Sequence, residues 1–275
     1  MWLALSDGAK LYYEDKGQGE LIVLVHGSLG DYRDWADQVH FLSNRSFRVV
    51  SYSRRNHYPN PWRDYPSNYS LLTERDDLFS LLKELKEPAY LIGHSYGGFA
   101  AAVAARDDPA LVRKLVLAEP PIFTLLKDKE DVALSLKFLS ETIEPGEKYL
   151  KEDNFELGIR VFLEGISGIK GVYDKLKPQF RQVMLDNSKT ALAEIEITPK
   201  RDPFDCEDAR RINVPTLLVK AEGSPRILRS IVLELAKCIP ASQVATIARS
   251  SHGMIWDNPK IFNESVLEFL RAVNK

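Results

Sequence analysis

The sequence predicts an α/β fold with a mainly parallel, doubly wound sheet and an inserted helical cap. Short apolar runs alternate with amphipathic stretches over residues 1–121 and 207–275, as expected when strands and helices follow one another in such a sheet. Over residues 122–206 the alternation stops and amphipathic helices succeed each other. The expected breaks between these helices are Pro145–Gly146, Gly165–Gly171 and Pro178. We therefore expect a core of residues 1–121 and 207–275 and a cap, or lid, of residues 122–206 over the strand ends, where such sheets bind ligands.

Each expected strand is an apolar run bounded by polar or turn-forming residues. The run Leu21–Val25 is apolar throughout, which is typical of a strand buried on both faces of a parallel sheet. The strands are expected at Leu11–Glu14, Leu21–Val25, Phe47–Tyr52, Pro88–Ile92, Leu115–Ala118, Pro215–Val219 and Val244–Ile247.

The helices of the core are predicted from periodicity and end signals. Leucines recur at helical spacing over Leu78–Leu85, and the alanine-rich stretch Phe99–Ala105 contains neither glycine nor proline. Asn258 and Pro259 supply an N-cap and a first-turn proline for a terminal helix. Further core helices are expected at Tyr32–Leu42 and Ile227–Ala236, and a polar loop at Ser53–Pro66.

Composition narrows the class of protein. The formal net charge is −2, which gives no reason to expect nucleic acid or an anionic membrane as a partner. No apolar run reaches membrane-spanning length, and no signal peptide is evident. Cys206 and Cys238 are too few for a disulfide scaffold, so we expect free thiols in a reducing compartment. The expected partner is a small-molecule substrate, the expected location is the cytoplasm, and homo-oligomerisation is left open.

The segment Gly93-His94-Ser95-Tyr96-Gly97-Gly98 is the most informative motif in the chain. A serine flanked by glycines between an apolar strand and a helix is typical of a nucleophile elbow, which projects the hydroxyl above the sheet. The helix that follows directs its positive N-terminal end toward the same point. The structural alternative is an ordinary strand-to-helix turn with an idle serine.

A serine hydroxyl needs a base to become a nucleophile. The chain contains five histidines, namely His26, His40, His57, His94 and His252. We predict His252 as the base because it lies in a polar loop after the last strand, next to a glycine. His94 adjoins the serine, but an elbow points neighbouring side chains apart. His26 is expected to buttress a loop at a strand end, and His40 to lie on a surface helix.

The chain resembles the α/β-hydrolase superfamily, in its serine-nucleophile branch with a helical cap. The resemblance is carried by His26-Gly27-Ser28, by the elbow around Ser95, and by His252 before the terminal helix. It implies a triad in the order serine, acid, histidine, with Ser95 as nucleophile and His252 as base. It also implies an oxyanion hole formed by the backbone N–H groups of Ser28 and Tyr96.

The acid of the implied triad departs from the superfamily pattern. Most members carry an aspartate shortly after the strand expected here at Pro215–Val219, where this chain has Ser224. We predict Glu119, which ends the preceding core strand and is followed by two prolines, because some branches place their acid there. Glu222 in the usual loop is the alternative acid, and Asp257 is a third candidate. A solvated turn or an ion pair is the structural alternative for Glu119.

Three residues are candidates for substrate binding. Arg54 follows the third core strand, in a loop that lacks the glycines of many superfamily members, and it is suited to bind a substrate carboxylate. His57 in the same loop is a candidate for the entrance, and Phe123 in the cap for an apolar acyl or aromatic pocket. Pairing is the alternative for the loop arginines, with three candidate partners, Asp31, Asp34 and Asp64.

These features favour a serine hydrolase that cleaves a carboxylic ester or related acyl bond of a small to medium, partly apolar substrate through an acyl-enzyme. No metal or organic cofactor is implied. Lactone hydrolysis, carbon–carbon bond hydrolysis and cofactor-free perhydrolysis remain open within this enzyme class. The alternative from another class is a non-catalytic or weakly catalytic small-ligand-binding protein on the same fold.

Overall fold

The strands form one eight-stranded sheet in the order β1-β2-β4-β3-β5-β6-β7-β8. The computed structural model describes residues 1–64, 69–197 and 204–272. Neighbouring strands from β4 to β8 run parallel, and β1 and β2 add an antiparallel edge. The strands are β1 (Trp2–Ala4), β2 (Lys10–Gly17), β3 (Glu20–Val25), β4 (Phe47–Tyr52), β5 (Ala89–His94), β6 (Val112–Ala118), β7 (Thr216–Ala221) and β8 (Ser242–Ile247). The α/β class and the mainly parallel sheet are confirmed.

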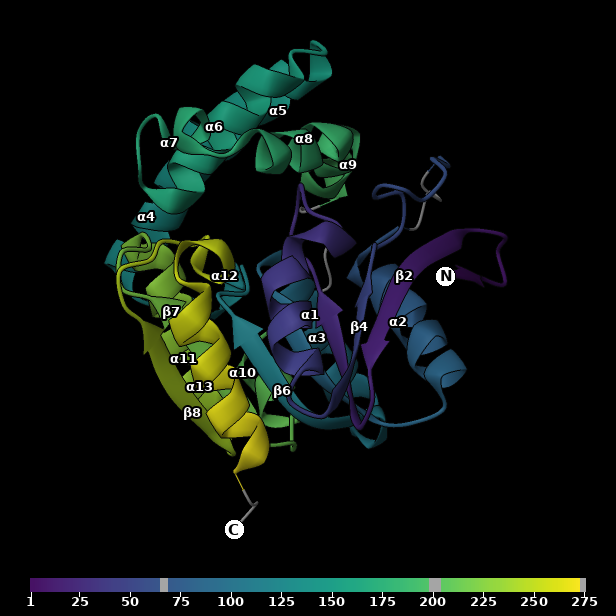
Figure 1. Ribbon diagram of the computed structural model, residues 1–275. Helices are drawn as coiled ribbons and strands as arrows, with labels where there is room; N and C mark the ends of the chain where they lie inside the picture. Colours follow the sequence, from purple (N-terminus) through teal and green to yellow (C-terminus); the bar gives the residue numbers. More distant parts are fainter. Residues whose placement is uncertain (65–68, 198–203, 273–275) are drawn as a thin grey trace.

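Helices cover both faces of the sheet, and each layer has its own apolar cluster (Figure 1). On one face lie α2 (Leu71–Leu85), α3 (Tyr96–Asp107), α10 (Cys206–Arg210) and α11 (Arg226–Cys238). On the other face lie α1 (Ala36–Ser43), α12 (Met254–Asp257) and α13 (Pro259–Arg271). Because the central strands are covered on both sides, β3 and β5 are buried along almost their whole length.

The helices between β6 and β7, here called the helical insertion, are α4 to α9. They lie together at one end of the sheet (Figure 1). Their bounds are α4 (Lys129–Phe138), α5 (Glu144–Lys151), α6 (Phe155–Ser167), α7 (Val172–Lys175), α8 (Pro178–Asp186) and α9 (Ser188–Ile197). Polar contacts join the insertion to the core. Asn187 donates to Asp31 at 2.8 Å and accepts from the backbone N–H of Tyr58 at 2.8 Å.

The structure corrects two local expectations. The predicted break at Pro145–Gly146 is wrong, because α4 continues through a π-helical turn, Leu139–Ile143, into α5. Pro145 directly follows this π-helical turn, in the first turn of α5. The short strand β1 was not expected. Part of the predicted loop Ser53–Pro66 and part of the predicted cap, residues 198–203, lie outside the described residues.

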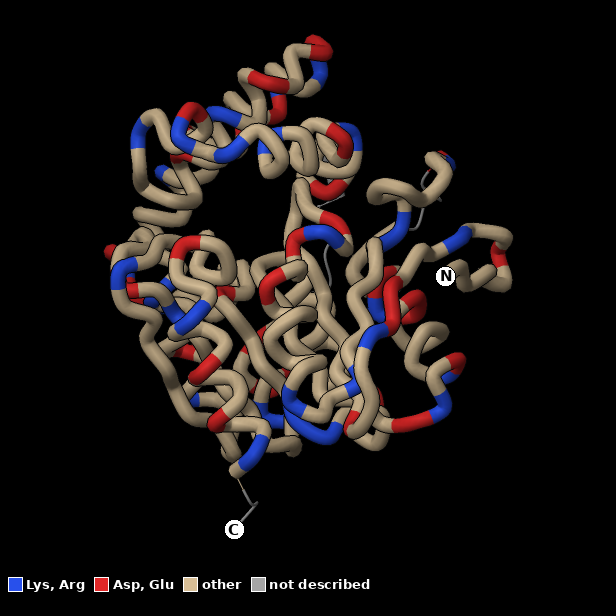
Figure 2. The backbone as a smooth tube through the Cα atoms, viewed as in Figure 1, with Lys and Arg blue, Asp and Glu red and all other residues tan. Residues whose placement is uncertain are grey.

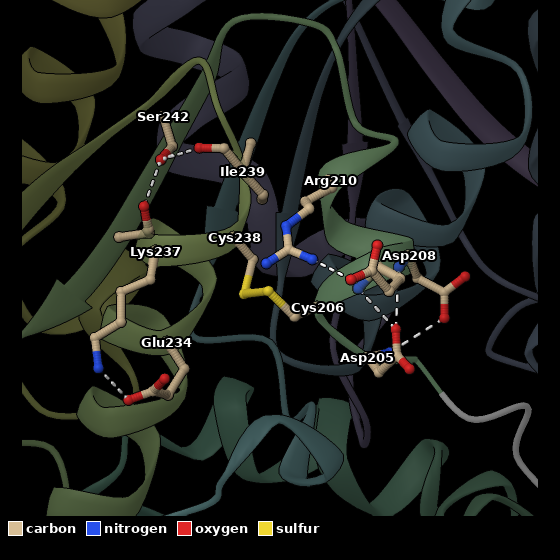
Figure 3. Close-up of a disulfide and its surroundings, with 11 residues drawn as sticks. Asp205, Cys206, Asp208, Arg210, Glu234, Lys237, Cys238, Ile239 and Ser242 are labelled. Carbon is tan, nitrogen blue, oxygen red and sulfur yellow. Dashed lines mark hydrogen bonds and ion pairs between the residues drawn. A yellow bond between two sulfur atoms is a disulfide. The ribbon is translucent and has the colours of Figure 1, made fainter.

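Cys206 and Cys238 form a disulfide, with their Cα atoms 5.2 Å apart (Figure 3). The expectation of two free thiols is therefore wrong. Cys206 begins α10 and Cys238 ends α11, and these two helices pack against each other. A count of cysteines does not say which helices meet, so the pairing follows from tertiary packing. The expectation of a reducing compartment rested on two free thiols, so the disulfide removes that support.

Charged residues are mixed in sign over the molecule. Lysines and arginines alternate with acidic residues along the outer helices and loops of both the core and the helical insertion (Figure 2). Within the part of the chain that the structure describes, no helix combines the length and the apolar character that crossing a bilayer requires.

Candidate active site

Ser95 stands at a strained bend between β5 and α3. Its φ of 52° and ψ of −127° lie outside the regions that residues with side chains ordinarily adopt. The backbone N–H of Ser95 donates to the carbonyl of Ala118 at 2.9 Å, which fixes the bend beside the end of β6. The bend therefore places the Ser95 hydroxyl at the carboxyl edge of the sheet, next to the N-terminus of α3.

The glycines of the motif allow close approach of backbone. A Cβ atom on Gly97 would lie 2.3 Å from the carbonyl oxygen of His26 and 2.4 Å from that of Val25. A Cβ atom on Gly93 would lie 2.6 Å from the carbonyl oxygen of Gly97. Only glycine fits at these positions, so the first turn of α3 can pack directly against the end of β3.

Glu119 and His252 contact each other at this edge. The Nδ1 atom of His252 lies 2.8 Å from Oε2 of Glu119, whose side chain is fully buried. The same oxygen accepts from the Ser224 hydroxyl at 2.8 Å, and Oε1 accepts from the backbone N–H of Ala221 at 2.8 Å. Glu119 also has a positive φ of 45°, so its backbone, like that of Ser95, is held in a sparsely populated conformation.

The other two candidate acids bind elsewhere. Glu222 is exposed, and its Oε2 accepts from the backbone N–H of Arg249 at 2.8 Å. Oδ2 of Asp257 accepts from the backbone N–H and the hydroxyl of Ser251, at 2.8 Å and 2.7 Å. Of the three carboxylates considered, Glu119 is the one hydrogen-bonded to His252.

His94 connects the elbow to the loop that carries His252. Its Nε2 lies 2.8 Å from the carbonyl oxygen of His252, and the two rings are 4.8 Å apart. Burial lowers the pKa of His94 to about 3, so the ring is neutral and its Nε2–H is the donor. Among the described residues, no hydrogen bond joins the Ser95 hydroxyl to the His252 ring. Such contacts are often long in the absence of substrate.

A cavity opens beside Ser95, between the core and the helical insertion. Ser28, Ser95 and Tyr96 form its core side, and Phe123 lines it as well. The insertion contributes mainly apolar side chains, including Phe138, Ile143, Leu150, Ile159, Phe162, Ile166 and Ile195. A concave, mainly apolar wall with a few polar groups is typical of a small-molecule site. The described residues contain no group of three or more His, Cys, Asp or Glu side chains placed to hold a metal ion.

Arg54 does not line this cavity, which corrects its expected role in binding a substrate carboxylate. Its side chain is fully buried and pairs with Glu74 at 3.1 Å and Glu194 at 2.5 Å. It also donates to the carbonyl oxygens of His26 at 3.1 Å and Gly27 at 3.2 Å. These contacts take up four of the five N–H donors of the guanidinium within the protein, and two of them hold the loop that carries Ser28.

The remaining loop residues are also engaged inside the protein. His57 is fully buried rather than exposed at an entrance: its Nδ1 lies 2.7 Å from the Gly30 carbonyl oxygen and its Nε2 lies 3.4 Å from Glu194. Arg55 pairs with Asp77 and Asp7, both at 2.6 Å. The arginines of this loop are thus paired, but with partners other than the three aspartates considered from the sequence.

Glu194, on α9, is a residue that sequence reasoning missed. It lines the cavity, yet its side chain is only 2% exposed. Burial opposes ionisation of Glu194, but the charge of Arg54, with smaller contributions from His57 and Ser28, outweighs it and lowers the pKa to about 2. The one signal in the sequence is a pair of glutamates, Glu194 and Glu196, in the otherwise apolar run from Ala191 to Ile197, and the pattern does not say which of them lines a cavity.

Comparisons with known proteins agree with this architecture. A family model described as the alpha/beta hydrolase family matches residues 22–265. An uncharacterized hydrolase, YraK, from Bacillus subtilis (strain 168) is 32% identical over 127 residues, 45% of each chain. A putative non-heme chloroperoxidase from Synechocystis sp. is 27% identical over 267 residues, 95% of each chain. The structure of an esterase from Exiguobacterium antarcticum superposes with a TM-score of 0.81 at 21% identity and covers 99% of both chains, a likeness of fold.

Proposed function

We propose a reaction for this chain, which belongs to the alpha/beta hydrolase family: cleavage of a carboxylic ester or related acyl bond by Ser95, through an acyl-enzyme. The observation that carries the proposal is the hydrogen bond between Glu119 and His252 Nδ1, formed at the same sheet edge as the strained Ser95 elbow. A buried carboxylate on one nitrogen of a histidine leaves the other nitrogen to accept a proton.

In the first step, Ser95 Oγ attacks the carbonyl carbon and its proton passes to Nε2 of His252. The tetrahedral intermediate collapses, and the imidazolium gives that proton to the leaving oxygen. Water then attacks the acyl-enzyme, with His252 again taking and returning one proton. Glu119 keeps the His252 ring in the tautomer with hydrogen on Nδ1 and stabilises the transient imidazolium.

The backbone N–H groups of Ser28 and Tyr96 are proposed to bind the oxyanion. Both residues line the cavity beside Ser95, and Tyr96 begins α3, where the helix dipole favours negative charge. Each such donor typically contributes on the order of 3 kcal/mol to the transition state. The mostly apolar wall of the cavity favours a small to medium, partly apolar acyl group.

Labelling with a fluorophosphonate serine-hydrolase probe tests the proposal. The wild-type protein is expected to react rapidly, with the modified peptide containing Ser95, and Ser95→Ala is expected to remain unlabelled while keeping the wild-type circular dichroism spectrum. A labelled wild type then goes to a panel of esters, thioesters and lactones. Absence of labelling in folded wild-type protein would overturn the proposal and favour a ligand-binding protein that lacks an activated serine.

A further inference from the structure

The wall of the cavity carries one charged side chain among the described residues that line it, and that side chain is Glu194. Its neighbours on the wall are otherwise apolar groups, hydroxyls and small residues. Ser28 lines the same cavity as Glu194. The charge therefore lies at the cavity wall, beside the loop that we propose supplies an oxyanion donor.

The charged cluster behind this wall is centred on Arg54. Arg54 pairs with both Glu194 and Glu74, so two buried carboxylates share one guanidinium. The guanidinium is fully buried and does not line the cavity, and no lysine or arginine does so among the described residues. Burial lowers the pKa of the neighbouring His26 well below its ordinary value, so that ring adds no positive charge.

We propose that Glu194 is a specificity-determining residue, which lets the cavity accept neutral acyl groups and makes it reject acyl groups that carry a carboxylate. The proposal rests on the function proposed above, because it concerns the substrate of the same site. It names the substrate class as neutral esters with an apolar acyl chain.

Electrostatics and desolvation act together against an anionic acyl group. A carboxylate entering the cavity would lose its hydration and meet no lysine or arginine among the described residues that line the wall. It would also lie near the ionised Glu194, and like charges repel strongly where water is excluded. Specificity by rejection of this kind needs no contact that favours the accepted substrate.

The test uses two acyl groups that differ little in shape, the mono-p-nitrophenyl ester of adipic acid and the p-nitrophenyl ester of adipamic acid. We expect wild-type kcat/KM at neutral pH, after subtraction of uncatalysed hydrolysis, to be at least about tenfold higher for the neutral amide. In Glu194→Gln this ratio is expected to fall at least about fivefold, mainly because hydrolysis of the acid becomes faster.

Glu74→Gln is the matched control. It removes the other carboxylate partner of Arg54 but does not touch the cavity wall, and each variant leaves Arg54 with one buried carboxylate. The ratio in Glu74→Gln is expected to stay closer to that of wild type. Equal effects of the two substitutions would overturn the assignment, since long-range charge balance would then explain the selectivity. Glu194→Met, which keeps the length without charge, replaces Glu194→Gln if the latter does not fold.

Failure of this inference and failure of the proposed function have different signatures. If wild-type protein hydrolyses neither ester and the fluorophosphonate probe does not label Ser95, the proposed function has failed. If wild type hydrolyses the acid and the amide equally well, the proposed function stands and the role of Glu194 is refuted. The wild-type comparison requires no variant, so it remains decisive whatever the stability of the substituted proteins.

Discussion

The sheet edge and the helical insertion build the two sides of the cavity in different ways. At the sheet edge, Ser95 and Glu119 both have positive φ values, 52° and 45°, and backbone hydrogen bonds hold each of them to the neighbouring strand. The insertion contributes side chains from α-helices and from the π-helical turn Leu139–Ile143, apolar apart from Glu194. Backbone conformation thus fixes the positions of Ser95 and Glu119 at the edge, whereas the side chains of the insertion decide how polar the opposite wall is.

This difference indicates which part of the site tolerates amino-acid substitution. A backbone bend at the end of a buried strand has few alternatives, because moving it breaks the pairing of several strands. A helix face that lines a cavity can exchange one apolar side chain for another at a cost usually below about 1.5 kcal/mol. Substitutions at the edge are therefore expected to affect the chemical step, and substitutions in the insertion to affect the choice of substrate.

The largest expected effect comes from the proposed base at the edge. We expect His252→Ala to lower kcat/KM for a p-nitrophenyl ester by at least about 10³-fold, because the group proposed to take the proton from Ser95 is then lost. Steady-state kinetics and circular dichroism measure activity and fold. His40, exposed on α1, provides the control, and His40→Ala is expected to keep wild-type activity. Comparable losses in both variants would mean that His252 is not the base.

The next largest expected effect distinguishes two carboxylates at the edge, Glu119 and Glu222. Glu119→Gln is expected to lower kcat/KM by about 10³-fold, since the amide cannot fix the required tautomer of His252 or stabilise its charged form. Glu222→Gln, which alters a carboxylate that caps the loop at Arg249, is expected to cost less than about tenfold. The two variants are compared by the same ester assay. A larger loss in Glu222→Gln would transfer the role of the acid to the usual loop.

The sheet was predictable from the sequence because its central strands are continuous apolar runs. All seven expected strands are present, and the boundaries of Phe47–Tyr52 were predicted without error. The missed strand, β1, is three residues long and mostly exposed, so it carries no such pattern. The wrongly predicted break at Pro145–Gly146 reflects a general ambiguity, since a proline in a first helical turn looks the same in sequence as one that ends a helix.

The bend at the sheet edge could be predicted from the sequence because its motif is local, and the charged contacts behind the cavity wall could not. Ser95 and its glycines are adjacent in the chain, so one segment predicts the bend. The contacts of Arg54 join residues 20 and 140 positions away, Glu74 and Glu194, and nothing in the sequence relates these three. The disulfide was missed for the same reason, because it depends on the packing of α10 against α11.

Glycine substitutions test the contrast between backbone and side-chain control. We expect Gly97→Ala to destabilise the protein by about 3 kcal/mol, because the new Cβ would overlap the carbonyl oxygens of Val25 and His26. In Gly146→Ala, on α5, the new Cβ would make an ordinary contact of 3.5 Å with Gly158, and helix propensity predicts a gain of up to about 1 kcal/mol. Urea unfolding measures both. Similar losses would refute the idea that the edge is the less tolerant region.

The smallest expected effect concerns pH and His94, which connects the elbow to the His252 loop. The pKa of His94 is about 3 in the folded protein, against an ordinary 6.5. Between these values the unfolded chain binds a proton that the folded protein does not, so stability falls as pH falls. From about pH 7.5 to pH 5, this group alone should cost about 2 kcal/mol. His94→Gln, whose amide can still donate to the His252 carbonyl, should remove that part of the loss in urea unfolding.

Because all other titrating groups are shared, the difference from wild type isolates His94. His40→Gln, at an exposed position, is the control and should retain the wild-type dependence. An unchanged pH dependence in His94→Gln would show that folding does not lower the pKa of this ring, and the assignment of a neutral His94 at pH 5 would then be wrong.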